Sequence, residues 1–502
     1  TRECTPEACP YANGYYARIK GALWDVLDVP CLTAETLQEY AERHTVCPFE
    51  LGLDSSLWSD VIIGDYNYLF DPVVHLVRFF ESAGDYIFLV DEAHNLPGRA
   101  REMHSAALTK TSFYEAKKLL GKGKSSLKNA LTKVNDVFIE WRHRAEEETA
   151  ARDGRFGKTF FLKERSEEFD HLLNRLCEPL EAWLDDHREP DETHTALLQL
   201  YFDVRAWLRV ADTFDDHFVL QITASGSEVR AAQLCLDPSA FLADSFALGR
   251  AAVLFSATLA PASYYKDLCG VPEARAVALR SPFPAGNQGL FCIGNVSTRY
   301  KDRDASLAIV AESLATMVRA RCGNYLAFFP SYAYMEQAYA QFKEHCPEIN
   351  CIKQENAMDE QQKAAFLAQF VPGPSQPLLG FAVMGGVFGE GVDLTGDRLI
   401  GVGIVGPGLP QVGPRQEQLR DYFEQTRGSG FDYAYRYPGM NKVLQAAGRV
   451  IRTPQDKGVV LLIDSRFAMP DYRRLMPPHW SHLKMIYDTE KLERELWRFW
   501  EE

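Results

Sequence analysis

Short apolar runs bounded by Gly, Asp and Pro recur along the first part of the chain, with helical segments between them. Residues 85–90 and 251–255 are two such runs, and residues 58–64 have a polar edge that enters a third. Runs of this length that alternate with helices are typical of parallel strands buried on both faces. The pattern therefore predicts an α/β unit.

A second α/β unit is predicted after Pro282 and Pro284. Its apolar runs are again short and are separated by segments with helical spacing. The alternation predicts a second parallel sheet. The predicted strands are residues 325–329, 378–384, 399–405 and 459–463, and the predicted helices include residues 306–319 and 361–370.

The stretch between the apolar runs at 85–90 and 251–255 has a different composition. Residues 105–216 contain few glycines and many Lys, Glu, Leu and Ala, with helical spacing over 113–120, 126–148 and 167–187. This pattern predicts an all-helical insertion. Two alternating segments, 218–225 and 228–236, flank Gly226 and predict a β-hairpin.

Composition bounds the class of protein. A chain of 502 residues is too long for one hydrophobic core, and 46% hydrophobic with 25% charged residues is ordinary for a folded protein. A net charge of −15 argues against a protein that coats nucleic acid through its overall charge. It permits a motor protein that binds one strand in a local basic groove. The chain shows neither a membrane-length apolar run nor a signal pattern, so a cytoplasmic protein is expected. The odd count of 11 cysteines does not suit a secreted disulfide framework.

The most informative segment is residues 89–94, where an apolar strand ends in Asp91, Glu92 and His94. Asp91 is suited to bind Mg²⁺ through its water shell, and Glu92 to orient or deprotonate an attacking water. His94 is suited to relay the nucleotide state to a neighbouring element. The alternative is a strand-to-helix turn in which Asp91 caps the next helix.

Residues 445–452 supply the complementary charge. Arg449 and Arg452 are spaced i, i+3, which places them on one face of a predicted helix that also carries Gln445. Guanidiniums that complete a nucleotide site at a domain interface contribute roughly 10³–10⁵ in rate. A solvated basic face is the alternative. Beside an acidic motif, the arginine pair indicates nucleotide hydrolysis.

Two further motifs carry weaker signals. Ser256 and Thr258 follow the strand at 251–255, where small hydroxyls can bond to the acidic motif in one nucleotide state; an ST-turn or helix cap is the alternative. Residues 385–391 hold four glycines after a predicted strand, which permits close backbone approach to a ligand beside Asp393. A flexible loop is the alternative there.

Early cysteines form another candidate site. Cys4, Cys9 and Cys47 lie in turns, two of them next to prolines, which suits thiolate ligation of a metal or an iron–sulfur cluster. Cys31 is a possible additional ligand. Buried free thiols are the alternative.

Residues 121–125 contain Gly-Lys-Ser, but a phosphate loop needs a glycine five positions before the Gly-Lys pair, and Lys118 stands there. The stretch is predicted to be a loop between helices. No phosphate loop is found in the sequence, and its start at Thr1 suggests that an N-terminal part is absent.

In this order, the motifs resemble the XPD/DinG family of superfamily 2 DNA helicases, especially the bacterial DinG-like ones. The resemblance covers nearly the whole chain. It is carried by Cys9-Pro10-Tyr11, Cys47-Pro48-Phe49, residues 65–72, Asp91-Glu92-Ala93-His94-Asn95, Ser256-Ala257-Thr258-Leu259, residues 389–393 and residues 445–452.

The resemblance implies an α/β protein with two RecA-like parallel-sheet motor domains, an inserted iron–sulfur domain and an inserted helical Arch domain. The expected divisions are a partial iron–sulfur domain at 1–50, the first motor at 51–104 and 217–284, the Arch at 105–216 and the second motor at 285–502. The family's phosphate loop should precede the cluster, so these residues are not expected to hydrolyse ATP efficiently.

The resemblance also implies ATP, Mg²⁺ and a [4Fe–4S] cluster, and ATP-driven 5′→3′ movement on single-stranded or tailed duplex DNA, in a monomer active in DNA repair or replication. It assigns Asp91 to magnesium, and Cys4, Cys9 and Cys47 to the cluster. It places Glu92, His94, Gln445, Arg449 and Arg452 at the reacting nucleotide, with Ser256, Thr258, Glu390, Gly391 and Asp393 beside it.

Two other functions stay open. A motor fold that binds nucleic acid without turnover would explain the missing phosphate loop. A helicase fused to an upstream nuclease would also fit the sequence. Tyr66 and Tyr68 could line a DNA path, and Lys122, Lys124 and Lys128 could contact the DNA backbone, although core aromatics and a solvated helix surface explain them equally well.

Overall fold

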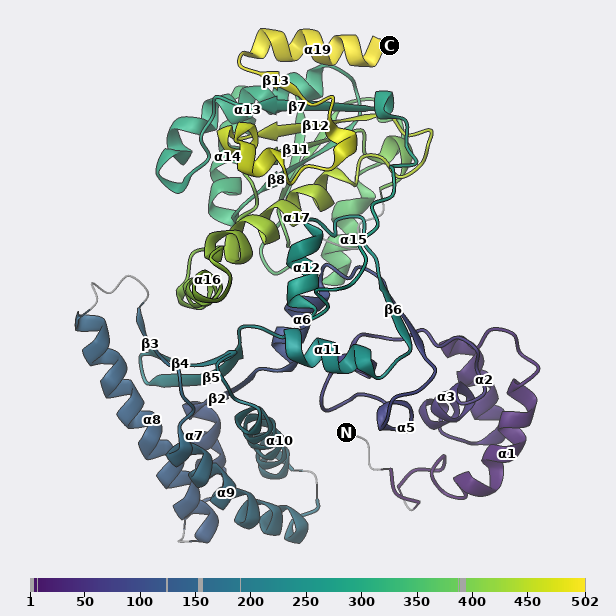
Figure 1. Cartoon of the computed structure of the whole chain (residues 1–502), viewed down its shortest axis with the longest axis vertical. Coiled ribbons are helices and arrows are strands. Elements are labelled where there is room, and N and C mark those ends of the chain that lie inside the picture. The colour runs from purple at the N-terminus through teal and green to yellow at the C-terminus, as the bar shows by residue number, and fades with distance from the viewer. Residues whose placement is uncertain are drawn as a thin grey trace. The chain divides into compact units, whose positions relative to one another are not determined.

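The computed structural model describes residues 4–6, 8–122, 125–151, 157–189, 191–386, 388 and 394–501 (Figure 1). The chain divides into two compact units, Thr1–Leu69 and Phe70–Glu502. Within the described ranges, no helix has both the length and the apolar character needed to cross a membrane.

The first unit consists of three helices around a small apolar core. Helix α2 (Ala34–His44) begins after Thr33, whose side chain accepts a hydrogen bond from the backbone N–H of Thr36. The other two helices are α1 (Tyr15–Val26) and α3 (Pro48–Ser56). The core residues are Ile19, Ala22, Ala41, Val46 and Leu51.

The strand predicted at 58–64 is wrong. Val61, Ile62 and Ile63 are exposed and lie outside any strand. An apolar run becomes a strand when a neighbour accepts its backbone hydrogen bonds, and no strand among the described residues pairs with this one.

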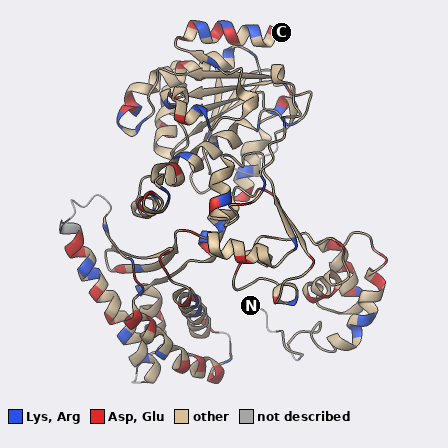
Figure 2. Ribbon diagram, viewed as in Figure 1, with Lys and Arg blue, Asp and Glu red and all other residues tan. Residues whose placement is uncertain are grey.

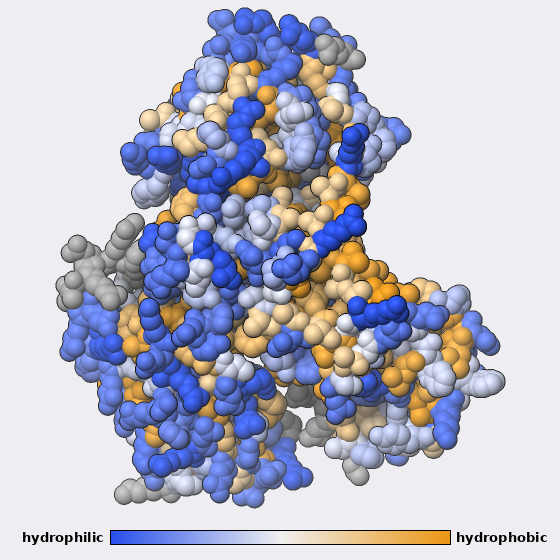
Figure 3. Space-filling model, viewed as in Figure 1, coloured by the Kyte–Doolittle hydropathy of each residue, from blue (hydrophilic) through white to orange (hydrophobic). Residues whose placement is uncertain are grey.

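In the second unit, β1 (Ile87–Val90) and β6 (Ala251–Leu254) form a two-stranded parallel sheet, in register from Ile87 opposite Ala251 to Val90 opposite Leu254. Both predicted strands are confirmed, but their predicted burial is wrong. Ile87 and Leu89 are 64% and 69% exposed, and Val253 is 50% exposed. Hydrophobic residues accordingly lie on the surface around β6 in Figure 3. The apolar composition of β1 and β6 is typical of strands that are covered on both faces of a sheet. In the described chain, however, each of these strands has only one neighbouring strand.

The insertion combines helices with a four-stranded antiparallel sheet of order β2-β5-β4-β3 (Figure 1). The predicted hairpin is confirmed, and Gly226 has a φ of 59° in its turn. The prediction of an all-helical insertion is wrong because the hairpin recruits two short strands from it as partners. The strands are β2 (Ala106–Thr109), β3 (Lys158–Leu162), β4 (Phe218–Ser225) and β5 (Glu228–Cys235). The helices are α7 (Lys110–Leu119), α8 (Ser126–Ala151), α9 (Glu167–Asp186) and α10 (Glu192–Asp212), the last of which was not predicted.

A seven-stranded parallel sheet of order β13-β7-β12-β11-β8-β10-β9 forms the largest layer. All four strands predicted for this part are confirmed, as β8, β10, β11 and β12. One face packs against α13, α14 and α19, and the other against α15 and α17. The strands are β7 (Gln288–Ile293), β8 (Asn324–Phe329), β9 (Asn350–Lys353), β10 (Leu378–Val383), β11 (Gly401–Val405), β12 (Gly458–Ile463) and β13 (Lys484–Ile486). The helices are α13 (Arg303–Arg319), α14 (Tyr332–His345), α15 (Glu360–Ala368), α17 (Tyr437–Ala447) and α19 (Thr489–Glu501).

A separate aromatic core joins the insertion to the part of the chain that carries the large sheet. The outer face of the four-stranded sheet contributes Val219, Ala232 and Leu234 to it. It meets α12 (Ala262–Leu268), α16 (Pro414–Arg427) and a π-helical turn (Asp432–Arg436). The Tyr433 hydroxyl donates to the Asp267 carboxylate. The aromatic core comprises Val219, Ala232, Leu234, Leu236, Tyr264, Tyr265, Leu268, Leu419, Phe423, Tyr433, Ala434 and Tyr435.

The remaining helices are short. They are α4 (Asn67–Phe70), α5 (Val77–Phe80), α6 (Leu96–Met103), α11 (Ser239–Ala247) and α18 (Pro470–Arg473).

Candidate nucleotide site

The acidic motif occupies the tight turn between β1 and α6. The backbone N–H of Glu92 donates to Asp91 Oδ1 at 2.7 Å, and that of Ala93 donates to the Phe255 carbonyl at 3.1 Å. Glu92 has a φ of 45°, a left-handed conformation that is uncommon for a non-glycine residue and often marks functional turns. Both carboxylates are exposed. Asn95, and not Asp91, stands at the N-cap of α6, so the capping alternative for Asp91 is wrong.

A hydrogen-bond network links the acidic motif to the end of β6. His94 Nδ1 lies 2.8 Å from Ser256 Oγ, and this hydroxyl also lies 3.2 Å from Glu92 Oε2. The backbone N–H of Thr258 donates to the same oxygen at 3.2 Å, which is the ST-turn named as the alternative. The turn and the link to the acidic motif therefore coexist.

The two motifs face one another through His94. Its side chain is only 3% exposed, and its Nε2 forms a hydrogen bond with Nε2 of Gln445 on α17. Gln445 lies 351 positions further along the chain. The contact joins the two-stranded sheet to the helix that precedes the arginines.

The arginines do not share a helix face as predicted, because α17 ends at Ala447 with Gly448 as its C-cap. Gly448 has an ordinary right-handed conformation there, with a φ of −66°, so the backbone at 448 does not itself require a glycine. Arg449 lies in the following turn and is 6% exposed, whereas Arg452 is exposed. The backbone N–H of Arg452 donates to Asp456 Oδ2 at 2.7 Å, which fixes the extended segment there.

The glycine-rich segment is described only in part, and Glu390, Gly391 and Asp393 lie outside the described residues. At its start, Gly385 has a φ of 71°, and a Cβ there would come within 3.0 Å of Lys442 Cε. The left-handed backbone conformation favours a glycine at 385, whereas the long Lys442 side chain is free to shift away from a Cβ.

Lys442 is a residue that the sequence motifs did not single out. It lies on α17 three residues before Gln445, and that spacing is the signal that could have found it. Burial lowers the pKa of the Lys442 ammonium. Its position beside Gly385 suits an anionic ligand.

The cysteines do not form a metal site in the described chain. Cys4 and Cys31 are exposed, and Cys9 and Cys47 are half-buried. Among the residues that the structure describes, no group of three or more His, Cys, Asp or Glu side chains could hold a metal ion. As placed, these cysteines are not gathered into one site, so no step below is routed through a cluster.

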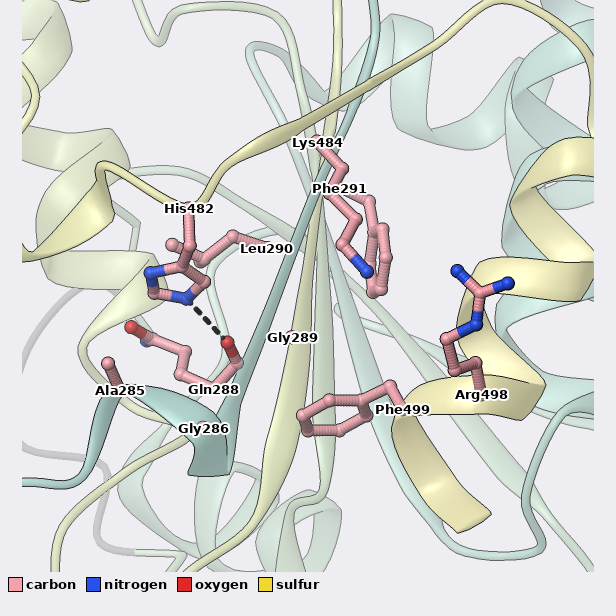
Figure 4. A pocket seen from close by; sticks show the side chains of 10 residues that line it. All are labelled: Ala285, Gly286, Gln288, Gly289, Leu290, Phe291, His482, Lys484, Arg498 and Phe499. Atoms are coloured by element: carbon pink, nitrogen blue, oxygen red, sulfur yellow. Dashed lines mark hydrogen bonds between the residues drawn. The ribbon is translucent and has the colours of Figure 1, made fainter. Parts of the chain in front are cut away.

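A pocket of about 170 Å³ lies elsewhere, at the start of β7 (Figure 4). His482, Lys484 and Arg498 line it together with Phe499. Both cations are paired with Glu495, at 2.6 Å for Lys484 and 3.1 Å for Arg498. Because ligands bind at the carboxyl ends of parallel strands, this pocket at a strand's amino end is not a nucleotide site.

At the acidic motif, two exposed carboxylates stand at the carboxyl end of a strand, which suits Mg²⁺ held largely through water and phosphate oxygens. The facing segment contributes Gln445 to the network through His94, and Arg449 and Arg452 follow Gln445 in the sequence. Such an arrangement can hydrolyse a phosphoanhydride.

Two known family models match parts of the chain. The model for the helicase C-terminal domain matches residues 314–483, and the DEAD_2 model matches residues 1–113.

Curated relatives match most of the chain. It is 24% identical to the general transcription and DNA repair factor IIH helicase subunit XPD of Schizosaccharomyces pombe, over 89% of this chain and 67% of that protein. It is 22% identical to the ATP-dependent DNA helicase CHL1 of Coccidioides immitis, over 90% of this chain and 60% of that protein.

The solved structure of S. tokodaii Xpd4 has the same fold, with a TM-score of 0.59 at 15% identity over 95% of both chains. The expected α/β architecture with RecA-like parallel sheets is therefore confirmed. From the family models, the relatives and this fold, the chain belongs to the XPD/DinG-like superfamily 2 helicases.

Proposed function

We propose that this chain is the motor of a DinG-like, ATP-dependent DNA helicase that moves 5′→3′ on single-stranded DNA and unwinds duplexes. The observation that carries the proposal is the hydrogen bond between Gln445 and His94, which brings the arginine segment to the acidic motif. The relatives named as helicases support the same activity.

In the proposed reaction, Glu92 orients and deprotonates the water that attacks the terminal phosphate. Asp91 would hold Mg²⁺ through its water shell, and the bound ion would supply positive charge beside the phosphate oxygens. Arg449 and Arg452 stabilise the negative charge of the transition state.

The nucleotide state would then be reported through His94. Its two ring nitrogens bond to opposite sides, Nδ1 to Ser256 and Nε2 to Gln445. A shift of Gln445 when the nucleotide leaves would free His94 and, through Ser256, alter the carboxylate of Glu92.

A single-turnover unwinding assay with the complete gene product tests the proposal. We expect ATP-dependent strand separation on duplexes with a 5′ single-stranded tail and little on duplexes with a 3′ tail. The absence of ATP-dependent separation on every tailed or forked substrate would refute the proposal, while preference for a 3′ tail would refute its direction.

The second candidate is a motor fold that binds DNA without turnover. The absence of a phosphate loop from the 502 residues favours it. The intact contacts among Glu92, His94 and Gln445 favour hydrolysis instead. A Gly-Lys-Thr or Gly-Lys-Ser loop encoded upstream of Thr1 would exclude the second candidate.

We also propose that Cys4, Cys9 and Cys47 belong to an iron–sulfur domain, as their order along the chain suggests. Replacing Cys47 with Ser is expected to lower the iron content and the visible absorbance of protein purified without oxygen, because a thiolate ligand is lost. The matched control is Cys322→Ser, which removes an exposed thiol assigned to no site. Equal iron content in the two variants, or none in the unsubstituted protein, would contradict the assignment.

A further inference from the structure

Arg101, Arg230 and Arg415, here called the arginine row, come from three elements and meet at the outer face of the four-stranded sheet. Arg230 lies on β5, where alternate side chains point to the same face. It therefore shares its face with Ala232 and Leu234, both of which belong to the aromatic core. Arg230 itself is exposed beyond that core.

Arg415 reaches the same face from α16. It precedes Leu419 by one helical turn, and residues four apart lie on the same side of a helix. Leu419 packs into the aromatic core against the sheet. Arg415 therefore extends over the sheet beside the core, and it is exposed.

Arg101 of α6 is fixed at the other end of the row. Its Nε donates to the Leu236 carbonyl at 2.9 Å, and its guanidinium carbon lies 5.8 Å from the centre of the Phe423 ring. From Arg230 to Leu236 the strand direction covers roughly 20 Å. The arginine row thus extends along the sheet instead of forming a compact cluster.

The row lacks carboxylate partners. Although the Arg415 residue is exposed, partial desolvation of its guanidinium lowers its pKa, the positive charges of Arg101 and Arg230 lower it further, and Glu102 opposes this effect. In the part of the chain that the structure describes, none of the three arginines forms an ion pair. Like charges left near one another cost free energy that a bound anion would recover. Such a row is notable in a chain of net charge −15, where acidic and basic residues are otherwise interspersed (Figure 2).

We propose that the arginine row binds the phosphate backbone of single-stranded DNA. Guanidiniums match phosphate geometry with paired hydrogen bonds, and an extended basic row can follow a strand. This inference rests on the proposed function, and it adds a DNA contact between the insertion and the second motor domain, away from the nucleotide site.

The test is the affinity of the full chain for a fluorescein-labelled oligothymidylate, measured by anisotropy at several salt concentrations. The double variant Arg230→Gln/Arg415→Gln is expected to bind roughly tenfold more weakly, because two charged hydrogen-bonding groups are lost. The slope of log affinity against log salt should fall in magnitude by about 1.4, since each lost single-strand phosphate contact removes about 0.7. The double variant Arg230→Lys/Arg415→Lys should recover much of the affinity because it keeps both charges.

The matched control is Arg188→Gln/Arg494→Gln, which removes the same charge from exposed positions on α19 and beyond α9. Equal affinity and slope in the two Gln variants would overturn the arginine row and leave the helicase proposal standing. If the unsubstituted chain fails to bind the oligonucleotide, both proposals fall.

An acidic protein partner is the competing occupant. Polyglutamate that binds the unsubstituted chain more tightly than oligothymidylate, and loses this binding in the Arg230→Gln/Arg415→Gln variant, would overturn the DNA assignment. Thermal unfolding verifies that the variants fold. If the double variant does not fold, Arg230→Gln alone decides the test, with Arg188→Gln as its control.

Discussion

Glu92→Gln is expected to lower DNA-stimulated ATP hydrolysis by roughly 10²–10⁴-fold in the complete gene product, because the amide cannot take a proton from the attacking water. Nucleotide affinity should change little. The Glu92 side chain is 62% exposed, so the substitution should not disturb a core. Steady-state phosphate release and equilibrium binding of a fluorescent ATP analogue measure the two effects.

Glu102→Gln is the matched control. Glu102 is exposed on α6, where it pairs with Arg99 at 3.5 Å on the surface. Such surface pairs contribute little to stability, so this variant should retain full hydrolysis. If the two variants hydrolyse ATP at similar rates, Glu92 is not the base.

Arg449→Ala is expected to lower ATP turnover by about 10³–10⁵-fold while leaving affinity for single-stranded DNA nearly unchanged. The reason is that a guanidinium facing the transition state raises the rate of ATP hydrolysis and does not contribute to the affinity for single-stranded DNA. Phosphate release and oligonucleotide anisotropy on the same preparation separate these quantities.

Because Arg449 is nearly buried, its loss could act through the fold. Arg449→Lys keeps the charge and most of the stem but lacks the planar fork. We expect this variant to melt close to the unsubstituted protein and still to turn over slowly. A large loss of DNA affinity without a loss of rate would contradict the role proposed for Arg449.

Patterns that depend on local sequence were predictable. Strands β8, β10, β11 and β12 are apolar runs that are buried on both faces of one sheet, and the hairpin of β4 and β5 shows regular alternation around Gly226. The short strands β2 and β3 escaped prediction because their strand state comes from pairing with that hairpin, across long separations in sequence.

The candidate site was predictable in its components but not in its contacts. Charge complementarity indicated that the segments near Glu92 and Arg449 belong together. The link through His94 and Gln445 depends on tertiary placement, as does the position of Lys442 beside Gly385. The end of α17 at Ala447 was missed because the apolar spacing continues through Val450 and Ile451 after the helix has stopped.

The aromatic core has a mechanical consequence. By sequence the insertion lies between β1 and β6, yet its sheet shares buried side chains with α16 and the π-helical turn, which both follow β11. Any hinge that opened between them would pull tyrosine and phenylalanine rings into water. In the proposed helicase, the insertion should therefore move together with α12 and α16 during each ATP cycle instead of swinging independently.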